Sequence, residues 1–349
     1  MSNSPTRPHT PSIGVGIIGM GFMGATHIKA YQAAAADGFA CRLIAISDPS
    51  PDRRTGLPPG GGNIGAPIQD RLFDPAKIHT YERPAQLLAN PSVALVSICT
   101  PTDTHVDLAI AALQAGKHVL LEKPVALAST DVARLAAAAK DAKTLCMPAM
   151  CMRFWPGWTF LREVYRDNRY GPLRALTLDR LGSGPTWSSD FYRDVSRSGG
   201  ALVDQHIHDT DFVVHLFGPP AAVRSSGTSM HVHTIYDYPN HPGLSIAAEG
   251  SWSMNPAFGY RMRYLAAFEK ATIEFDLVST PTVTIYADGQ KTHPDLPPST
   301  GYDGQVRHLL RAITNHSRTV DAPIDEAVTV ARVLEAELRS TQTRGPVSL

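Results

Sequence analysis

Residues 13–24 read IGVGIIGMGFMG, and this stretch decides the fold. Its apolar opening is typical of a buried strand, and the glycines that follow have the spacing G-x-G-x-x-G at the start of an apparent helix. Glycine is needed here because a tight turn and a close backbone approach to a pyrophosphate leave no room for a Cβ atom. The helix N-terminus would then face the phosphates. The predicted dinucleotide contacts are Gly19, Gly21, Phe22, Met23 and Gly24.

A carboxylate follows the next apolar run. Asp48 comes directly after CRLIAIS, where an acidic side chain can accept hydrogen bonds from the adenosine ribose hydroxyls of NAD. The same charge would repel the 2'-phosphate of NADP. Arg53 and Arg54 follow closely and could tolerate that phosphate, so NAD is the predicted cofactor and NADP stays open.

The first part of the chain alternates short apolar runs with longer helical stretches. This alternation over residues 13–150 predicts an α/β Rossmann domain, in which a doubly wound parallel sheet is flanked by helices. One crossover departs from the pattern, because Pro49 to Pro67 contains LPPGGGNIGAP. Proline and glycine at that density predict a long loop in place of a helix.

The 349 residues exceed what one hydrophobic core usually organises, which favours two domains. Residues 1–12 are expected to be a disordered start. Residues 151–349 are expected to form an α+β domain for substrate binding and oligomerisation. Its helix-like run at 201–217 precedes strand patterns over 222–287, which predict an open and largely antiparallel sheet.

Charge and hydropathy exclude several classes of protein. Lys plus Arg and Asp plus Glu both total 32, so no net field attracts nucleic acid or an anionic membrane. No run reaches the roughly 20 apolar residues of a membrane span. The four cysteines form no C-x-x-C pair and are expected to be reduced packing residues. These features predict a cytoplasmic protein with no nucleic-acid or membrane partner.

Three further segments carry a family resemblance. SICTPTDTH at 97–105, AGKHVLLEKP at 115–124 and SGGALVDQHIHDTD at 198–211 resemble the Gfo/Idh/MocA oxidoreductases, the glucose-fructose oxidoreductase and inositol dehydrogenase group. The resemblance covers nearly the whole chain. It implies an NAD(P)-dependent oxidoreductase that moves a hydride between the nicotinamide and a secondary alcohol or ketone of a sugar, inositol or related polyol.

The resemblance also implies roles for individual residues. The lysine of E-K-P, Lys123, would sit beside the nicotinamide and the substrate, and the D-x-x-x-H pair would fall on Asp204 and His208. Arg153 would lie near the cleft and contact substrate. His206 stands where the family usually has a small residue, often glycine, and is taken as a second substrate contact. The remaining implied cofactor contacts are Thr100, Pro101, His105 and Glu122.

The residue types fit this chemistry. Alcohol oxidation needs a group that takes the hydroxyl proton, and histidine titrates in the useful range. Asp204 and His208 are four residues apart on a predicted helix and would share one face. His208 is therefore the predicted general acid/base, with Asp204 as its orienting or substrate-binding partner. Lys123 could stabilise a developing alkoxide or share the proton.

Other functions remain open at this stage. Histidines at 206, 208, 231 and 233, with nearby aspartates, could bind zinc, although hydride transfer needs no metal and none is predicted. A redox-neutral enzyme that uses bound NAD to cleave or epimerise a glycoside is one alternative. A non-catalytic dinucleotide-binding regulator is another. Trp155, Trp158, Trp187 and Trp252 could stack on a sugar or pack in the core. The open sheet predicts a homodimer or homotetramer.

Overall fold

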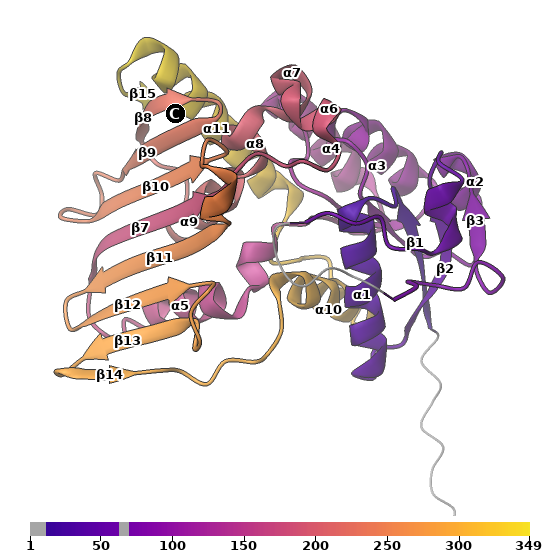
Figure 1. Cartoon of the computed structure of the whole chain (residues 1–349), viewed down its shortest axis with the longest axis horizontal. Helices are drawn as coiled ribbons and strands as arrows, with labels where there is room; N and C mark the ends of the chain where they lie inside the picture. Colours follow the sequence, from indigo (N-terminus) through magenta and orange to yellow (C-terminus); the bar gives the residue numbers. More distant parts are fainter. Residues whose placement is uncertain (1–11, 63–69) are drawn as a thin grey trace, which may run out of the picture.

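The computed structural model describes residues 12–62 and 70–349. These residues form two sheets, each with its own helices (Figure 1). Apart from Ser12, the start predicted to be disordered lies outside the described residues. The described part of the loop expected at Pro49 to Pro67 contains one short 3-10 turn, Asp52–Thr55, and otherwise irregular backbone.

The first sheet has six strands, all parallel, in the order β3-β2-β1-β4-β5-β6. The strands are β1 Ile13–Ile18, β2 Cys41–Ser47, β3 His79–Tyr81, β4 Leu95–Ile98, β5 His118–Leu121 and β6 Cys146–Pro148. The helices between them are α1 Phe22–Ala36, α2 Pro84–Leu88, α3 His105–Gln114 and α4 Ser129–Asp141. This order is that of a Rossmann sheet, whose ligand crevice lies where the order reverses, beyond the carboxyl ends of β1 and β4. The predicted fold of this half is confirmed.

The second sheet has nine strands in the order β14-β13-β12-β11-β7-β10-β9-β8-β15. Only β7 and β10 pair in parallel, so the prediction of a largely antiparallel sheet is also confirmed. The strands are β7 Leu173–Leu181, β8 Ala222–Thr228, β9 His231–Asp237, β10 Ser245–Ser251, β11 Arg261–Phe268, β12 Ala271–Asp276, β13 Val283–Ala287, β14 Gln290–Thr292 and β15 Val347–Ser348. The helices are α5 Pro156–Arg166, α6 Ser189–Arg193, α7 Val195–Ser198, α8 Gly200–Asp204, α9 Ile207–Phe217, α10 Gly301–Thr314 and α11 Ile324–Thr343, with 3-10 turns at Cys151–Phe154 and Pro256–Phe258. A further 3-10 turn, Thr102–Thr104, lies in the first half between β4 and α3.

Helices cover one face of this second sheet, and an aromatic cluster fills the space between them. Trp158 of α5 is fully buried, and its ring centroid lies 4.4 to 6.2 Å from those of Phe212, Tyr264 and Phe275. The edge-on geometry of these pairs is the arrangement that aromatic quadrupoles favour. Trp158 is therefore a core residue and does not stack on a ligand.

The last two helices return to the first half of the chain. Helix α10 lies along α1 (Figure 1), and Arg307 of α10 pairs with Asp37 at 2.5 Å. Helix α11 packs against α4, where Glu335 accepts hydrogen bonds from the main-chain nitrogen and the hydroxyl of Ser129 at 2.7 and 2.9 Å. The C-terminal segment thus fastens the second sheet to the Rossmann half.

One sequence prediction about the second half is wrong. The run at 201–217 is not a single helix, because α8 ends at Asp204 and α9 begins at Ile207, with a bend at Gln205 and His206. At the bend, the Gln205 side chain donates to main-chain oxygens of β7 and β10, and the His206 side chain lies beside Tyr236 of β9 and Glu337 of α11. Across the described ranges, no helix combines the length and apolar character needed to cross a bilayer.

Candidate active site

The glycine loop after β1 has the geometry of a dinucleotide cradle. Gly19 has φ +90°, and a Cβ atom there would lie 2.6 Å from the main-chain oxygen of Cys99. A Cβ atom on Gly24 would lie 2.1 Å from the main-chain oxygen of Gly19. At Gly21, by contrast, a Cβ atom would meet no atom of the described residues within 4 Å. The packing of the protein itself thus requires glycine at positions 19 and 24. Gly21 instead borders open space at the N-terminus of α1, as a pyrophosphate requires.

Asp48 lies at the end of β2 beside this loop. One carboxylate oxygen accepts a hydrogen bond from the Met20 main-chain nitrogen at 2.8 Å, and the other accepts one from the Ser50 nitrogen at 2.9 Å. The side chain is buried, and of the roughly four acceptor positions of a carboxylate, two have no hydrogen-bond donor among the described residues. The guanidinium of Arg53 lies 3.8 Å from the carboxylate and is half-exposed. The Arg54 guanidinium binds the main-chain oxygen of Asp48 at 2.7 Å.

Lys123 and Asp204 meet across the two halves of the molecule. Lys123 follows β5, and its Nζ donates to the main-chain oxygen of Asp204 at 2.7 Å and to the carboxylate at 3.3 Å. Both side chains are about 15% exposed, which leaves one side of the pair accessible. Burial raises the pKa of Asp204, and the Lys123 ammonium partly offsets that effect. The partner of Asp204 is therefore Lys123, and the predicted pairing of Asp204 with His208 is corrected.

His208 lies in the first turn of α9. Its Nδ1 is enclosed without a hydrogen-bond partner among the described residues. Burial, and then the positive charges of Lys123 and Arg180, lower the pKa of His208 well below its usual range. The imidazole is therefore neutral near neutral pH, which is the form that accepts a proton.

Glu122 is buried, so the cofactor contact predicted for it is wrong. Its carboxylate lies 2.9 Å from Nε2 of the fully buried His27 and accepts a hydrogen bond from the Lys123 main-chain nitrogen at 3.1 Å. His27 lies on the inner face of α1 and was not singled out from the sequence. Its place one turn after the last glycine of the loop is the signal that could have identified it. The pair connects the glycine-loop helix to the segment that carries Lys123.

His105 holds two loops together. The ring is buried, and its nitrogens lie 2.8 Å from the main-chain oxygens of Thr100 and Pro124. Pro101, next to Thr100, is exposed. Thr100 and Pro101 therefore remain available to a cofactor. His105 is not available to a cofactor. The direct cofactor contact predicted for it is therefore wrong, and its ring instead supports the loop that carries Thr100 and Pro101.

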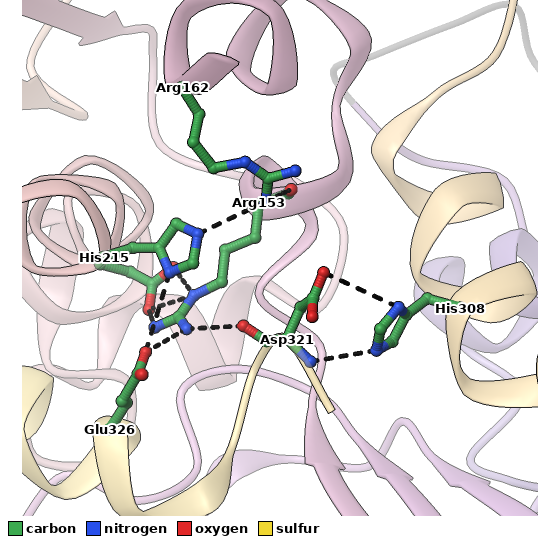
Figure 2. A network of polar contacts seen from close by, with 7 residues as sticks. Arg153, Arg162, His215, His308, Asp321 and Glu326 are labelled. Atoms are coloured by element: carbon green, nitrogen blue, oxygen red, sulfur yellow. Dashed lines mark hydrogen bonds and ion pairs between the residues drawn. The ribbon is translucent and has the colours of Figure 1, made fainter. Parts of the chain in front are cut away.

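Arg153 does not reach the cleft, so its predicted substrate contact is wrong. The side chain is 1% exposed, and its guanidinium binds the Asp211 carboxylate at 2.5 and 2.9 Å. Figure 2 shows the same guanidinium directed at Glu326 and at the main-chain oxygen of Asp321. His215 also faces Glu326 in this view, at 3.8 Å. Burial requires such pairing, because an unpaired guanidinium would lose its hydration without compensation.

His206 is likewise buried and cannot contact substrate. Its side chain is 0% exposed and faces Glu337 of α11 and Tyr236 of β9. The prediction failed because a histidine inside a D-x-x-x-H motif has the same sequence signature whether it faces the cleft or the core.

An aromatic row contains Trp187 and Trp252, which were considered from the sequence, together with Phe22 and Tyr192, and Tyr192 was missed. Ring centroids are 5.9 Å apart between Phe22 and Trp187, 6.3 Å between Trp187 and Tyr192, and 5.6 Å between Tyr192 and Trp252. Trp252 donates its indole N–H to Gln205, the neighbour of Asp204, at 2.7 Å. The row thus runs from the glycine loop to the bend beside the lysine. Trp187 and Tyr192 are partly exposed and can face a ligand, whereas Trp155 and Trp252 are buried.

The histidines considered for a metal site do not gather. In the part of the chain that the structure describes, no three His, Cys, Asp or Glu side chains converge as metal ligands would. His231 lies 3.1 Å from Glu249 on the second sheet.

The cradle, the carboxylate after β2 and the accessible lysine define a two-domain, dinucleotide-dependent oxidoreductase. The chain belongs to the Gfo/Idh/MocA oxidoreductase family. The family model described as an NAD-binding Rossmann fold matches residues 13–150, and the model of the GFO/IDH/MocA C-terminal domain matches residues 158–274.

Individual relatives agree with this assignment. Inositol 2-dehydrogenase of Rhizobium meliloti is 27% identical over 326 residues, which is 90% of each chain. An uncharacterised oxidoreductase of Synechocystis is 30% identical over 220 residues, but the match covers 62% of this chain and 54% of that protein. Among solved structures, levoglucosan dehydrogenase with NADH and levoglucosan has a TM-score of 0.80 at 19% identity, covering 97% of this chain and 99% of that one. Aldose-aldose oxidoreductase of Caulobacter crescentus with glycerol has a TM-score of 0.79 at 22% identity, covering 97% and 100%.

We predict that Arg153→Met destabilises the protein without affecting ligand binding. The substitution leaves the Asp211 carboxylate buried and unpaired, which should lower the free energy of unfolding by about 3–5 kcal/mol. Urea denaturation measures this loss, and Arg153→Met with Asp211→Asn should recover part of it. A variant with unchanged stability and a raised KM for substrate would return Arg153 to the binding site.

Proposed function

We propose that this protein transfers a hydride between NAD and a secondary alcohol or ketone of a sugar, inositol or related polyol. The observation that carries the proposal is the contact of Lys123 Nζ with Asp204, beside a neutral His208 and next to the dinucleotide cradle. Relatives named as inositol and levoglucosan dehydrogenases support the substrate class. The four free cysteines suit a reducing compartment, and we place the enzyme in the cytoplasm.

Each of the three residues has a separate role in the proposed alcohol oxidation. His208 accepts the hydroxyl proton, because its lowered pKa keeps it neutral at working pH. The Lys123 ammonium donates a hydrogen bond to the same substrate oxygen and stabilises the negative charge that develops there. Asp204 holds that ammonium in place through its carboxylate and main-chain oxygen.

The cofactor would be held by the residues of the cradle. Main-chain nitrogens of Phe22 and Met23 begin α1 and would face the pyrophosphate, and Asp48 would bind the ribose. Thr100 and Pro101 would lie under the dinucleotide. Bound NAD would supply the hydride acceptor. The open space beside Gly21 is the observation that supports this fit.

We predict that Lys123→Ala and His208→Ala lower kcat by at least roughly a hundredfold, because each removes a group that acts on the reacting oxygen. NADH affinity, measured by fluorescence titration, should change little.

In the wild type, kcat/KM for oxidation should stay constant as the pH is lowered, until the pH is well below the usual histidine range. It should then fall as His208 becomes protonated, since the pKa of His208 is lowered.

The outcomes separate the alternatives. Full turnover by His208→Ala on the true substrate would move the base role to Lys123. A product formed from a glycoside without net NADH would favour the redox-neutral alternative. Binding of NAD without turnover across a broad panel of sugars, inositols and their keto forms would favour the regulator.

Asp204→Asn should lower kcat less than Lys123→Ala or His208→Ala does, because the main-chain oxygen of residue 204 would still bind the lysine.

We predict a preference for NAD over NADP. The Asp48 carboxylate would accept hydrogen bonds from ribose hydroxyls and repel a 2'-phosphate. Asp48→Ser should narrow the preference, because it also frees Arg53, 3.8 Å away, to meet the phosphate. Comparing kcat/KM for the two cofactors measures the effect, with Asp48→Ser/Arg53→Ala as the matched control. Tighter binding of NADP by the wild type would contradict the role of Asp48.

We predict that the protein is a homodimer or homotetramer assembled through the face of the second sheet that lies opposite α5. On that face Ile235, Leu265 and Tyr286 are 40–48% exposed. Exposed apolar side chains on one face of a sheet favour association with a second copy. Light scattering should give the mass of two or four chains, and Leu265→Lys should reduce it. A wild type that stays monomeric at micromolar concentration would contradict this assembly.

A further inference from the structure

The bend between α8 and α9 supplies Lys123 with one of its two acceptors. In a continuous helix the His208 N–H would donate to the main-chain oxygen of Asp204. Here the His208 N–H donates to the main-chain oxygen of Gln205 at 3.3 Å, and the His206 N–H donates to the main-chain oxygen of Ala201. The Asp204 oxygen accepts from Lys123 Nζ at 2.7 Å instead. The position of the ammonium therefore depends on the helix stopping at Asp204.

Gln205 holds one side of the bend. Its amide nitrogen donates to the main-chain oxygens of Arg180 in β7 and Ser251 in β10, at 2.5 and 3.0 Å. Its amide oxygen accepts the indole N–H of Trp252. All of these partners belong to the second sheet or directly follow it, so Gln205 anchors the bend to β7 and β10.

His206 holds the other side. Its Nε2 lies 3.3 Å from the Glu337 carboxylate of α11 and 3.3 Å from the Tyr236 hydroxyl of β9. The ring packs against Gly250 of β10, where a Cβ atom would lie 2.7 Å from that of His206. The glycine on the strand thus makes room for the large side chain on the helix.

The charges around His206 favour the imidazolium. Glu337 is fully buried, and Asp209, the nearest acid on α9, is paired with Arg180 at 2.8 Å. Burial by itself would lower the pKa of His206, but the Glu337 carboxylate opposes this and the pKa is raised. The Tyr236 hydroxyl faces the same pair, and burial keeps it protonated by raising its pKa well above the usual range. His206 and Glu337 therefore lie as a buried pair between the bend and α11, with 3.3 Å between Nε2 and the carboxylate, and His206 Nδ1 has no hydrogen-bond partner among the described residues.

We propose that His206, paired with Glu337, is a positioning residue for Lys123. By fixing the bend, the pair presents the main-chain oxygen of Asp204 to the lysine ammonium. The inference rests on the proposed function, in which Lys123 acts on the reacting oxygen. His206 itself touches no substrate, which distinguishes this role from the one that its sequence motif suggested.

The test compares His206→Ala with the double variant His206→Ala/Glu337→Gln. The single change leaves a buried carboxylate without its cation, so the Tm should fall, and neutralising Glu337 should restore much of it. Because neither variant fixes the bend, kcat should be lowered roughly ten- to hundredfold in both, with NADH affinity unchanged. If kcat recovers together with the Tm in the double variant, the role is merely structural and the proposal is overturned. If the single variant does not fold, the double variant decides.

A second measurement does not depend on turnover. Lys123 is labelled with acetic anhydride in the cofactor-free protein and quantified by peptide mass spectrometry, with the 81% exposed Lys77 as the internal reference. Labelling of Lys123 should be several-fold faster in the double variant than in the wild type, because its Nζ loses a main-chain acceptor. Unchanged labelling would overturn the positioning role. A wild type without turnover on any polyol would instead contradict the proposed function, and the labelling would still decide the inference.

The matched control is Thr210→Val. The Thr210 hydroxyl donates to the same Glu337 carboxylate at 3.1 Å but lies beyond the bend, on α9. The substitution should lower the Tm and leave both kcat and the labelling of Lys123 unchanged. If Thr210→Val changes them as much as His206→Ala does, any disturbance near Glu337 is sufficient and the specific role of His206 is overturned.

Discussion

The contact between Lys123 Nζ and Asp204 is the interaction on which the arrangement of the site depends. It joins a loop at the carboxyl end of the Rossmann sheet to the end of a helix in the second half. Neither group alone can serve the proposed chemistry, because an ammonium needs fixed acceptors if it is to point at one substrate oxygen. Helices α10 and α11 pack against the first half of the chain. They thereby stabilise the placement of the two halves relative to each other, which this contact requires.

Buried ion pairs surround that contact. Arg153 pairs with Asp211, Arg180 with Asp209, and His206 with Glu337, and every acid in this set lies on α9 or α11. Such pairs gain little net stability, because desolvation offsets their attraction. They do restrict geometry, since a displaced partner would leave a charge buried alone. The Arg180–Asp209 pair joins α9 to β7, and the Arg153–Asp211 pair joins α9 to the turn Cys151–Phe154.

The aromatic side chains beside the site bear on the kind of substrate that it can bind. Trp187 and Tyr192 extend an aromatic row from the glycine loop toward the bend. A partly exposed aromatic surface beside charged groups is suited to a molecule with an apolar ring face and many hydroxyls, which is the character of a sugar or an inositol.

Some features of this protein follow from the sequence alone. The glycine spacing, the strand before it and Asp48 after the next strand predicted the Rossmann half correctly, because hydrophobic periodicity and turn chemistry act over a few neighbouring residues. Lys123, Asp204 and His208 were selected because their motifs resemble those of a known family. The two-domain order was predicted from the chain length and from the change of hydrophobic pattern after residue 150.

Tertiary structure decided which of the selected residues meet. Asp204 pairs with Lys123, 81 residues away in the chain, and Arg153 and His206 face buried acids that their motifs do not reveal. The helix that was expected to carry Asp204 and His208 on one face is broken. Local patterns could not predict these outcomes, because the direction of a polar side chain is set by the partners that folding brings beside it. Those partners lie on strands and helices far away in the sequence.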